Sequence, residues 1–273
     1  MEPTNSKKRA REDKIPSFFE LVRNTTKEDD EEGCPPLCWG DEDDPAVFSD
    51  WKIAVTTTAS TTTESSSVDE FLQRTYTVHK AILGLGPHKS KYFLRLFQND
   101  TLAESKDSTS RIKLTPMEAE AFPMMLNFMY IHPREVKRYK FLFHAIFTTK
   151  IKSSESHGKD ITPSKIVPVA LKHLADYFEI PSLLKFVNDY IEEDVDEDNL
   201  EEYVTAANMY NFEEIYDKVE NVAAINWQSL FISKDGKELT TMPKFMELLP
   251  VERQRRIFLK SLWQAKENPP GED

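Results

Sequence analysis

The 273-residue chain has a hydrophobic content of 39% and a formal net charge of -12 at pH 7. Its length and composition predict about two packed domains, and its negative charge disfavours direct binding to nucleic acid, whose affinity depends on lysine and arginine neutralising phosphates. No apolar run reaches the roughly 18 residues of a membrane span, and the N-terminus lacks the apolar segment of a signal peptide. We therefore expect an intracellular protein, in the nucleus and/or the cytoplasm, with protein partners and no membrane contact.

Residues 1–45 predict a disordered tail, because their mixture of charged, proline and polar residues buries too little apolar surface to offset the entropy of the chain. The basic cluster of this tail consists of Lys7, Lys8, Arg9 and Arg11. Such a cluster is typical of a nuclear import signal and also of a solvated charge run. The two cysteines, Cys34 and Cys38, do not complete a four-ligand zinc site, so we expect no metal and assign them no function.

Three short strands are expected, and together they predict a small sheet. In residues 50–55, Trp51, Ile53 and Val55 alternate with polar Asp50 and Lys52, which is the two-residue period of a half-buried strand. The other two candidates are residues 75–78 (TYTV) and 111–114 (RIKL).

The stretch from Ala81 to Phe97 (AILGLGPHKSKYFLRLF) raises the question of a phosphate-binding loop, because two glycines precede a Lys-Ser pair. A loop of the form G-x-x-x-x-G-K-[ST] would need glycine at the positions of Leu83 and His88, and both are missing. We therefore predict a helix, a turn and a second helix instead of a nucleotide site.

The turn of this segment is expected to hold Gly84, Gly86 and Pro87, followed by exposed His88 and Lys89. Ser90 is expected to cap the second helix. The apolar side chains expected in the core are Ile82, Leu83, Leu85, Tyr92, Phe93, Leu96 and Phe97. Burial of each such side chain stabilises the fold by about 1.5 to 3 kcal/mol.

A capping box predicts that the next helix starts at Thr115. The Thr115 side chain and the Glu118 side chain can each accept a hydrogen bond from the other's backbone N–H, and Pro116 suits the first helical position. The apolar face that follows consists of Ala119, Phe122, Met125, Leu126 and Met129. Pro123 lies inside this helix and removes a hydrogen bond, so we expect a kink or a restart there.

The second half of the chain reads as helical. Residues 131–164 are expected to be an insertion in which 139–147 (YKFLFHAIF) can form a helix. Helical periodicity resumes in residues 166–178 (IVPVALKHLADYF), 182–191 (SLLKFVNDYI) and 245–263 (FMELLPVERQRRIFLKSLW). Two further amphipathic segments flank a break at Asn211, and residues 266–273 predict a frayed tail.

Taken in order, the blocks DWKIAV, YTVHKAIL, SKYFLRLF, IKL, EAFPMMLNFMY and PVALKHLADYFEIPSLLKFVNDYI resemble those of a BTB/POZ domain. The resemblance covers residues 46–192, with insertions near 56–72 and 131–164, and residues 193–265 resemble the start of the BACK helical extension. It implies an α+β fold with a small three-stranded sheet flanked by helices, followed by an α-helical C-terminal extension. One departure is GLGPHK between Leu83 and Ser90, which is longer than the family's usual connection.

The most specific part of the resemblance is YTVHK followed by S-x-Y-F-x-x-L-F. Its signature residues are His79, Ser90, Tyr92 and Phe93. The resemblance implies that His79 is a structural residue at a strand-to-helix junction, hydrogen-bonded to backbone. A catalytic reading of His79 lacks a nucleophile elbow, paired metal-ligand histidines and a glycine-rich cofactor loop, so we expect no enzyme and no cofactor.

The resemblance also implies two interaction sites. Asp50 and Lys89 match charged positions of the family's homodimer interface, with a pair of merely solvent-exposed charges as the alternative. Leu102 and Glu104 match the hydrophobic-x-Glu motif by which many BTB adaptors contact the cullin-three scaffold, with an accidental loop sequence as the alternative.

Two functions follow as hypotheses. The first is a non-catalytic, homodimerising BTB adaptor that recruits a cullin-RING E3 ubiquitin ligase to a client protein. The second is a nuclear BTB scaffold or transcriptional co-regulator without cullin binding, whose import is directed by the basic cluster. The sequence carries no familiar substrate-reading domain that would identify the client.

Overall fold

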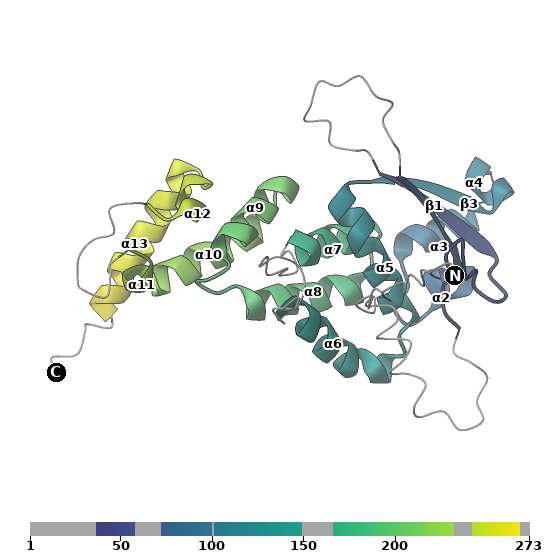
Figure 1. Cartoon of the computed structure of the whole chain (residues 1–273), viewed down its shortest axis with the longest axis horizontal. Coiled ribbons are helices and arrows are strands. Elements are labelled where there is room, and N and C mark those ends of the chain that lie inside the picture. Colours follow the sequence, from purple (N-terminus) through teal and green to yellow (C-terminus); the bar gives the residue numbers. More distant parts are fainter. Residues whose placement is uncertain (1–36, 58–71, 100, 149–165, 232–241, 268–273) are drawn as a thin grey trace, which may run out of the picture. The chain divides into compact units, whose positions relative to one another are not determined.

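The computed structural model describes residues 37–57, 72–99, 101–148, 166–231 and 242–267 (Figure 1). All of these residues lie within one compact unit. The basic cluster, Cys34 and most of the expected N-terminal tail lie outside the described residues, as do most of the residues near 56–72, residues 149–165 and most of the C-terminal tail.

The three strands form one mixed sheet in the order β2-β1-β3. They are β1 (Trp51–Thr57), β2 (Leu72–Val78) and β3 (Thr109–Leu114). β1 is antiparallel to β2 and parallel to β3, so the strand that was read from the alternation of Trp51, Ile53 and Val55 is the central one. The indole Nε1 of Trp51 donates a hydrogen bond to Ser110 Oγ over 3.0 Å, which joins β1 to β3 by side chains as well. The predicted small sheet is confirmed.

Three short helices connect β2 with β3: α2 (Lys80–Leu85), α3 (Lys91–Gln98) and α4 (Ala103–Asp107). The helix, turn and helix are as predicted, but Gly84 lies inside α2 and not in the turn. A Cβ at Gly84 would lie 3.3 Å from the ring of Phe97, so the absence of a side chain lets α2 pack closely against α3.

Two other expectations for this segment are wrong. Leu85 is 72% exposed, because α2 ends there and its apolar face does not continue into the turn. His88 is buried: its ring packs 4.5 Å from that of Phe128, centroid to centroid, and its Nδ1 lies 3.2 Å from Ser182 Oγ. The buried His88 side chain therefore anchors the lengthened turn to the core, while Lys89 is exposed as expected.

Helix α5 (Pro116–Tyr130) is the central helix of the domain and is buried over most of its surface. The predicted capping box is present: Thr115 N donates to Glu118 Oε2 over 2.7 Å, and Glu118 N donates to Thr115 Oγ1 over 3.3 Å. The helix continues through Pro123 as one element, so of the expected kink or restart the restart does not occur. The lost hydrogen bond is outweighed by the burial of large apolar side chains such as Phe122 and Met125.

Residues 131–164 are not all inserted loop. The short 3-10 helix η1 (Pro133–Glu135) leads into α6 (Val136–Thr148), which includes the helix expected at 139–147. Tyr139 and Phe143 of α6 are fully buried, and both rings pack against Phe186. The Tyr139 hydroxyl also donates to the Met124 carbonyl of α5 over 3.0 Å. Helix α6 is therefore part of the core.

The remaining helices are α7 (Ile166–Tyr177), α8 (Pro181–Asp194), α9 (Leu200–Tyr210), α10 (Glu213–Ile225), α11 (Trp227–Phe231), α12 (Lys244–Glu247) and α13 (Val251–Glu267). The break expected at Asn211 is confirmed: this residue ends α9 in the left-handed conformation, with φ of 55°. Helix α7 packs against α5, α8 and α9, and α13 packs along α10. Among the described helices, none combines the length and the apolar character needed to cross a membrane.

Candidate protein-interaction surfaces

His79 lies at the junction of β2 and α2 and is buried. Its backbone N–H donates to Tyr130 Oη over 2.8 Å, its Nδ1 lies 2.9 Å from the same oxygen, and its Nε2 lies 2.8 Å from the Val47 carbonyl. Because a carbonyl can only accept, the neutral ring carries its proton on Nε2 and Nδ1 accepts from the Tyr130 hydroxyl. Both ring nitrogens are thus used in holding three segments together, as a structural residue requires.

Ser90 joins α3 to the end of α7. Its Oγ accepts a hydrogen bond from Phe93 N over 3.1 Å, which caps α3, and donates one to the Phe178 carbonyl over 2.5 Å. The Phe93 ring is stacked on the Phe178 ring with centroids 5.2 Å apart, and the Tyr92 ring meets Phe178 edge-on. Ser90, Tyr92 and Phe93 therefore join α3 to Phe178, the residue that follows α7.

Asp50 has a structural task in addition to the interface role implied by the resemblance. Its carboxylate accepts a hydrogen bond from the backbone N–H of Lys80 over 2.8 Å and so supplies the cap that His79 does not give to α2. Lys89 is exposed at the turn after α2. No hydrogen bond or ion pair joins the Asp50 and Lys89 side chains within the described part of the chain. The structure therefore does not bring the two charges together within one protomer.

Large apolar side chains are exposed on the same α2 segment and before β1. Phe48 is 88% exposed, and its φ of 59° is uncommon for a residue with a Cβ. Its neighbour Val47 and Leu85 of α2 are also exposed. Sequence reasoning missed Phe48 because nothing in its local pattern distinguishes it from a core residue.

Leu102 and Glu104 lie at the start of α4, beyond α3. Leu102 is the residue that precedes the helix, its side chain is partly exposed, and Glu104 lies in the first turn. Burial raises the pKa of the Tyr92 phenol, and the charges of Tyr177 and Glu104 raise it further, so α4 and the end of α7 are electrostatic neighbours of Tyr92. The rings of Tyr92 and exposed Tyr177 lie 5.8 Å apart. We call Leu102, Glu104, Tyr92 and Tyr177 the α4 surface.

The C-terminal helices are joined to the preceding ones through Lys172 of α7, which sequence reasoning did not single out. Its ammonium is buried, donates to Asn188 Oδ1 over 2.8 Å and lies 2.7 Å from the Glu214 carboxylate. It also lies 4.7 Å from the centre of the Phe212 ring. A lysine in an otherwise apolar helical stretch was the available signal.

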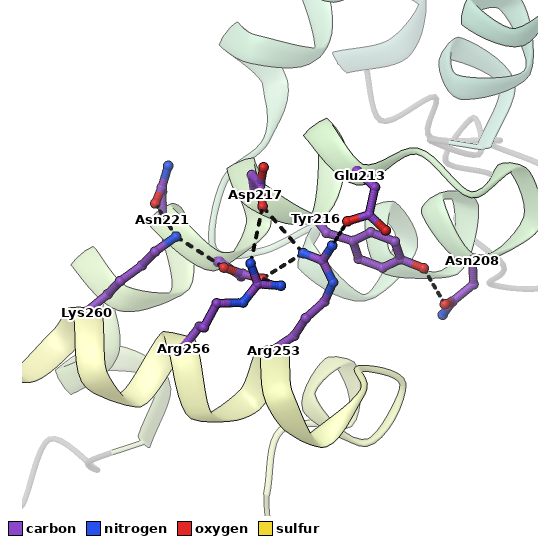
Figure 2. A network of polar contacts seen from close by, with 9 residues as sticks. Asn208, Glu213, Tyr216, Asp217, Asn221, Arg253, Arg256 and Lys260 are labelled. Carbon is purple, nitrogen blue, oxygen red and sulfur yellow. Dashed lines mark hydrogen bonds and ion pairs between the residues drawn. The ribbon is translucent and has the colours of Figure 1, made fainter.

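Helices α10 and α13 are joined by an ionic network (Figure 2). The Arg253 guanidinium donates to Glu220 Oε1 over 2.7 Å, pairs with Glu213 and lies 4.3 Å from the centre of the Tyr216 ring. Arg256 and Lys260 also pair with Glu220, at 3.2 Å and 3.1 Å. The signal in the sequence is a spacing of three and four residues within each charged set, which places its members on one helix face.

No cluster of three or more metal-ligating side chains occurs among the residues that the structure describes. The described hydrogen bonds of His79 and Ser90 join neighbouring segments of the fold, and none of them joins His79 to Ser90. The chemistry on the surface is that of protein recognition: apolar side chains beside isolated charges.

The family model of the BTB/POZ domain matches residues 67–141. No curated protein shows significant sequence similarity to the chain. The matched range includes the His79 junction, the Ser90 cap and Leu102 and Glu104 of the α4 surface, and the mixed three-stranded sheet with flanking helices agrees with the BTB fold. BTB/POZ domains are protein-interaction domains that commonly dimerise and bind other proteins. Residues 67–141 thus carry the match to the BTB/POZ domain, and a helical C-terminal region follows them.

Proposed function

We propose that the protein is a homodimerising, non-catalytic adaptor that recruits a cullin-RING E3 ubiquitin ligase. The observation that carries the proposal is the α4 surface, where Leu102 is accessible and Glu104 lies within the next helical turn. A leucine beside a carboxylate gives a partner one apolar anchor and one charge that fixes register. We include in this proposal that the C-terminal helices form a BACK-like extension, since such an extension often follows a BTB domain.

Binding to a purified cullin N-terminal domain tests the proposal. The double variant Leu102→Asp with Glu104→Lys should weaken binding by about thirtyfold or more, because it removes the anchor and reverses the charge. Val251→Asp is the matched control: it also places a carboxylate on an exposed apolar residue, but in α13. Absence of binding by the wild-type protein would contradict the adaptor function and favour the alternative, a nuclear scaffold or co-regulator.

The homodimer is proposed to use the exposed residues before β1 and on the α2 segment. Phe48, Leu85 and Lys89 are accessible there, and exposed apolar patches mark interfaces. Phe48→Asn with Leu85→Asp should convert a dimer to a monomer in light scattering, and asparagine tolerates the positive φ of position 48. Leu102→Asp is the reciprocal control and should leave the mass unchanged. A wild-type monomer at all concentrations would contradict the dimer.

Localisation in the nucleus and/or the cytoplasm is likewise proposed. The basic cluster at the N-terminus supports import, and it lies outside the described residues. Replacement of Lys7, Lys8 and Arg9 by alanine in a fluorescent fusion should shift the protein toward the cytoplasm. An unchanged distribution would remove the import signal from the proposal.

A further inference from the structure

Helix α13 has an apolar face that its own neighbours leave uncovered. The inner stripe of the helix, Arg253, Ile257 and Ser261, recurs every four residues and is buried against the adjoining helices. On other sides of the helix, Leu259, Leu262 and Trp263 remain accessible, and Trp263 is 66% exposed. An exposed tryptophan beside two leucines is a feature of binding surfaces, because tryptophan dominates the energy of many interfaces.

A pocket of about 400 Å³ opens on this side of the helix pair. Its lining consists of Asn221 from α10 and Arg256, Leu259, Lys260, Trp263 and Gln264 from α13. This volume is at the lower end of ligand pockets and suits one or two side chains of a peptide. The lining therefore offers an apolar wall, two amides and two cations, without a carboxylate among the described residues that form it.

The ionic network fixes this pocket in place. Glu220 is fully buried and holds the head groups of Arg256 and Lys260, whose positions on the pocket wall are thereby set. Lys260 also donates to Asn221 Oδ1 over 2.8 Å. The side chains of Arg256 and Lys260 stay partly exposed, at 49% and 37%, so each can form an ion pair with a further anionic group. A preorganised pocket lowers the entropy cost of binding.

The charges decide between three occupants. A second copy that docked by this same face would place like charges against each other, which costs affinity. An anionic bilayer is a broad surface and would also meet the exposed carboxylates of Glu213 and Asp217 in the adjoining network. A peptide contacts the pocket alone, so its acidic side chains can reach Arg256 and Lys260.

We propose that the α10–α13 pocket binds an acidic peptide segment of a partner protein that carries a leucine or aromatic anchor. The anchor packs on Leu259 and Trp263, and an aspartate or glutamate of the segment pairs with Arg256 and Lys260. That this pocket binds the client of the ligase rests on the proposed adaptor function, whereas peptide binding by the pocket does not depend on that function.

Selection from a random phage-displayed peptide library on the full-length protein tests the pocket. Enriched peptides should combine Asp or Glu with Leu, Phe or Trp, and a synthetic copy of the strongest should bind measurably in calorimetry. Trp263→Ala should weaken that peptide by about thirtyfold or more, since truncation of a central tryptophan removes the main anchor. Lys260→Met should weaken it by about tenfold, because a charged hydrogen bond is lost while the aliphatic stem remains.

Two controls lie on the same helix and outside the pocket lining: Val251→Ala and Arg255→Met, both at exposed positions. They should leave peptide affinity unchanged, and thermal melts of all four variants should show that Trp263→Ala is folded. The cullin-contact variant Leu102→Asp with Glu104→Lys should also retain the peptide. Loss of cullin binding with peptide binding intact therefore contradicts only the adaptor function.

Four results would overturn the pocket proposal. They are the failure to enrich any peptide that depends on Trp263, equal binding of a peptide whose acids are replaced by amides, Trp263-dependent binding to vesicles of phosphatidylserine and phosphatidylcholine, and Trp263-dependent self-association in light scattering. The last two would assign the face to a membrane surface or to a second copy of the chain.

Discussion

Arg253 of α13 places its guanidinium 2.7 Å from the carboxylate of Glu220 of α10, and both side chains are almost wholly removed from water. Ions that have lost their hydration are stable only when each keeps its partner. This pair therefore links the stability of the last helix to two side chains.

Replacement of Glu220 by alanine should lower the free energy of unfolding by about 3 to 5 kcal/mol, because Arg253 would stay buried without its buried carboxylate partner. Glu220→Leu combined with Arg253→Met should cost less than the sum of the two single changes, since no fully buried charge is then left without its partner. Urea unfolding followed by circular dichroism measures both. A loss of unfolding free energy below about 0.5 kcal/mol in Glu220→Ala would contradict a stabilising role of the pair.

Asp194→Ala should destabilise the junction of α8 and α9. The hydroxyls of Tyr190 and Tyr203 donate to the two oxygens of this carboxylate, over 3.0 Å and 2.6 Å, and both rings are buried. Each phenol left without an acceptor costs about 1 to 3 kcal/mol. The control Asp189→Ala changes an exposed aspartate of the same helix, so equal chemical-denaturation midpoints for the two variants would argue against this role.

Ser90→Ala should lower stability by about 1 to 3 kcal/mol, because α3 loses its cap and the Phe178 carbonyl loses a buried donor. Threonine at this position keeps the hydroxyl and should recover part of the loss. Lys91→Ala, at the exposed next residue, is the matched control for thermal unfolding. A melting temperature of Ser90→Ala equal to that of the control would refute the double role of this hydroxyl.

The stability contributed by His173 should depend on pH. A hydrogen bond to Glu118 over 2.6 Å raises the pKa of His173 above its ordinary 6.5, although burial acts in the opposite direction. Burial alone would raise the pKa of Glu118, but the hydrogen bonds from His173 and Thr115 outweigh it and hold this pKa below 4.5. The pair should therefore stabilise the fold most between about pH 4.5 and 6.5.

The sign follows from proton binding. His173 binds its proton more tightly when folded, so its contribution is complete below its unfolded pKa and is lost as pH rises through the raised one; the Glu118 contribution is lost as pH falls through the lowered one. The stability difference between wild type and His173→Gln should thus be larger at about pH 5.5 than at about pH 8. His132→Gln, at an exposed histidine, serves as the control. A pH-independent difference would contradict the ionic character of the contact.

Signals that act within one turn of chain were readable from the sequence. The capping box of Thr115 and Glu118 and the helix break at Asn211 depend on hydrogen bonds and φ values of neighbouring residues, and both are present. The central strand was readable as well, because burial on one face imposes its own alternation on Trp51, Ile53 and Val55.

Contacts between distant segments were not readable. His88 was expected to be exposed because it follows a Gly-Pro turn, yet Phe128 and Ser182 cover it from α5 and α8. Leu85 was expected in the core, but it is the last residue of α2 and its side chain is exposed. In the ionic network, the spacing indicates the faces of α10 and α13, but it does not tell which face meets which.

Lys172 determines how the chain can be divided for experiments. A fragment cut at residue 192, where the resemblance ends, would keep this ammonium and remove both Phe212 and the carboxylate of Glu214 from it. In this fragment Lys172 would be exposed to solvent on a surface that is buried in the full chain. Interaction assays would then detect binding to a surface that partners of the full chain do not meet. The shortest fragment that retains these contacts extends beyond Glu214, so the unit to clone for partner screening is the domain together with its following helices.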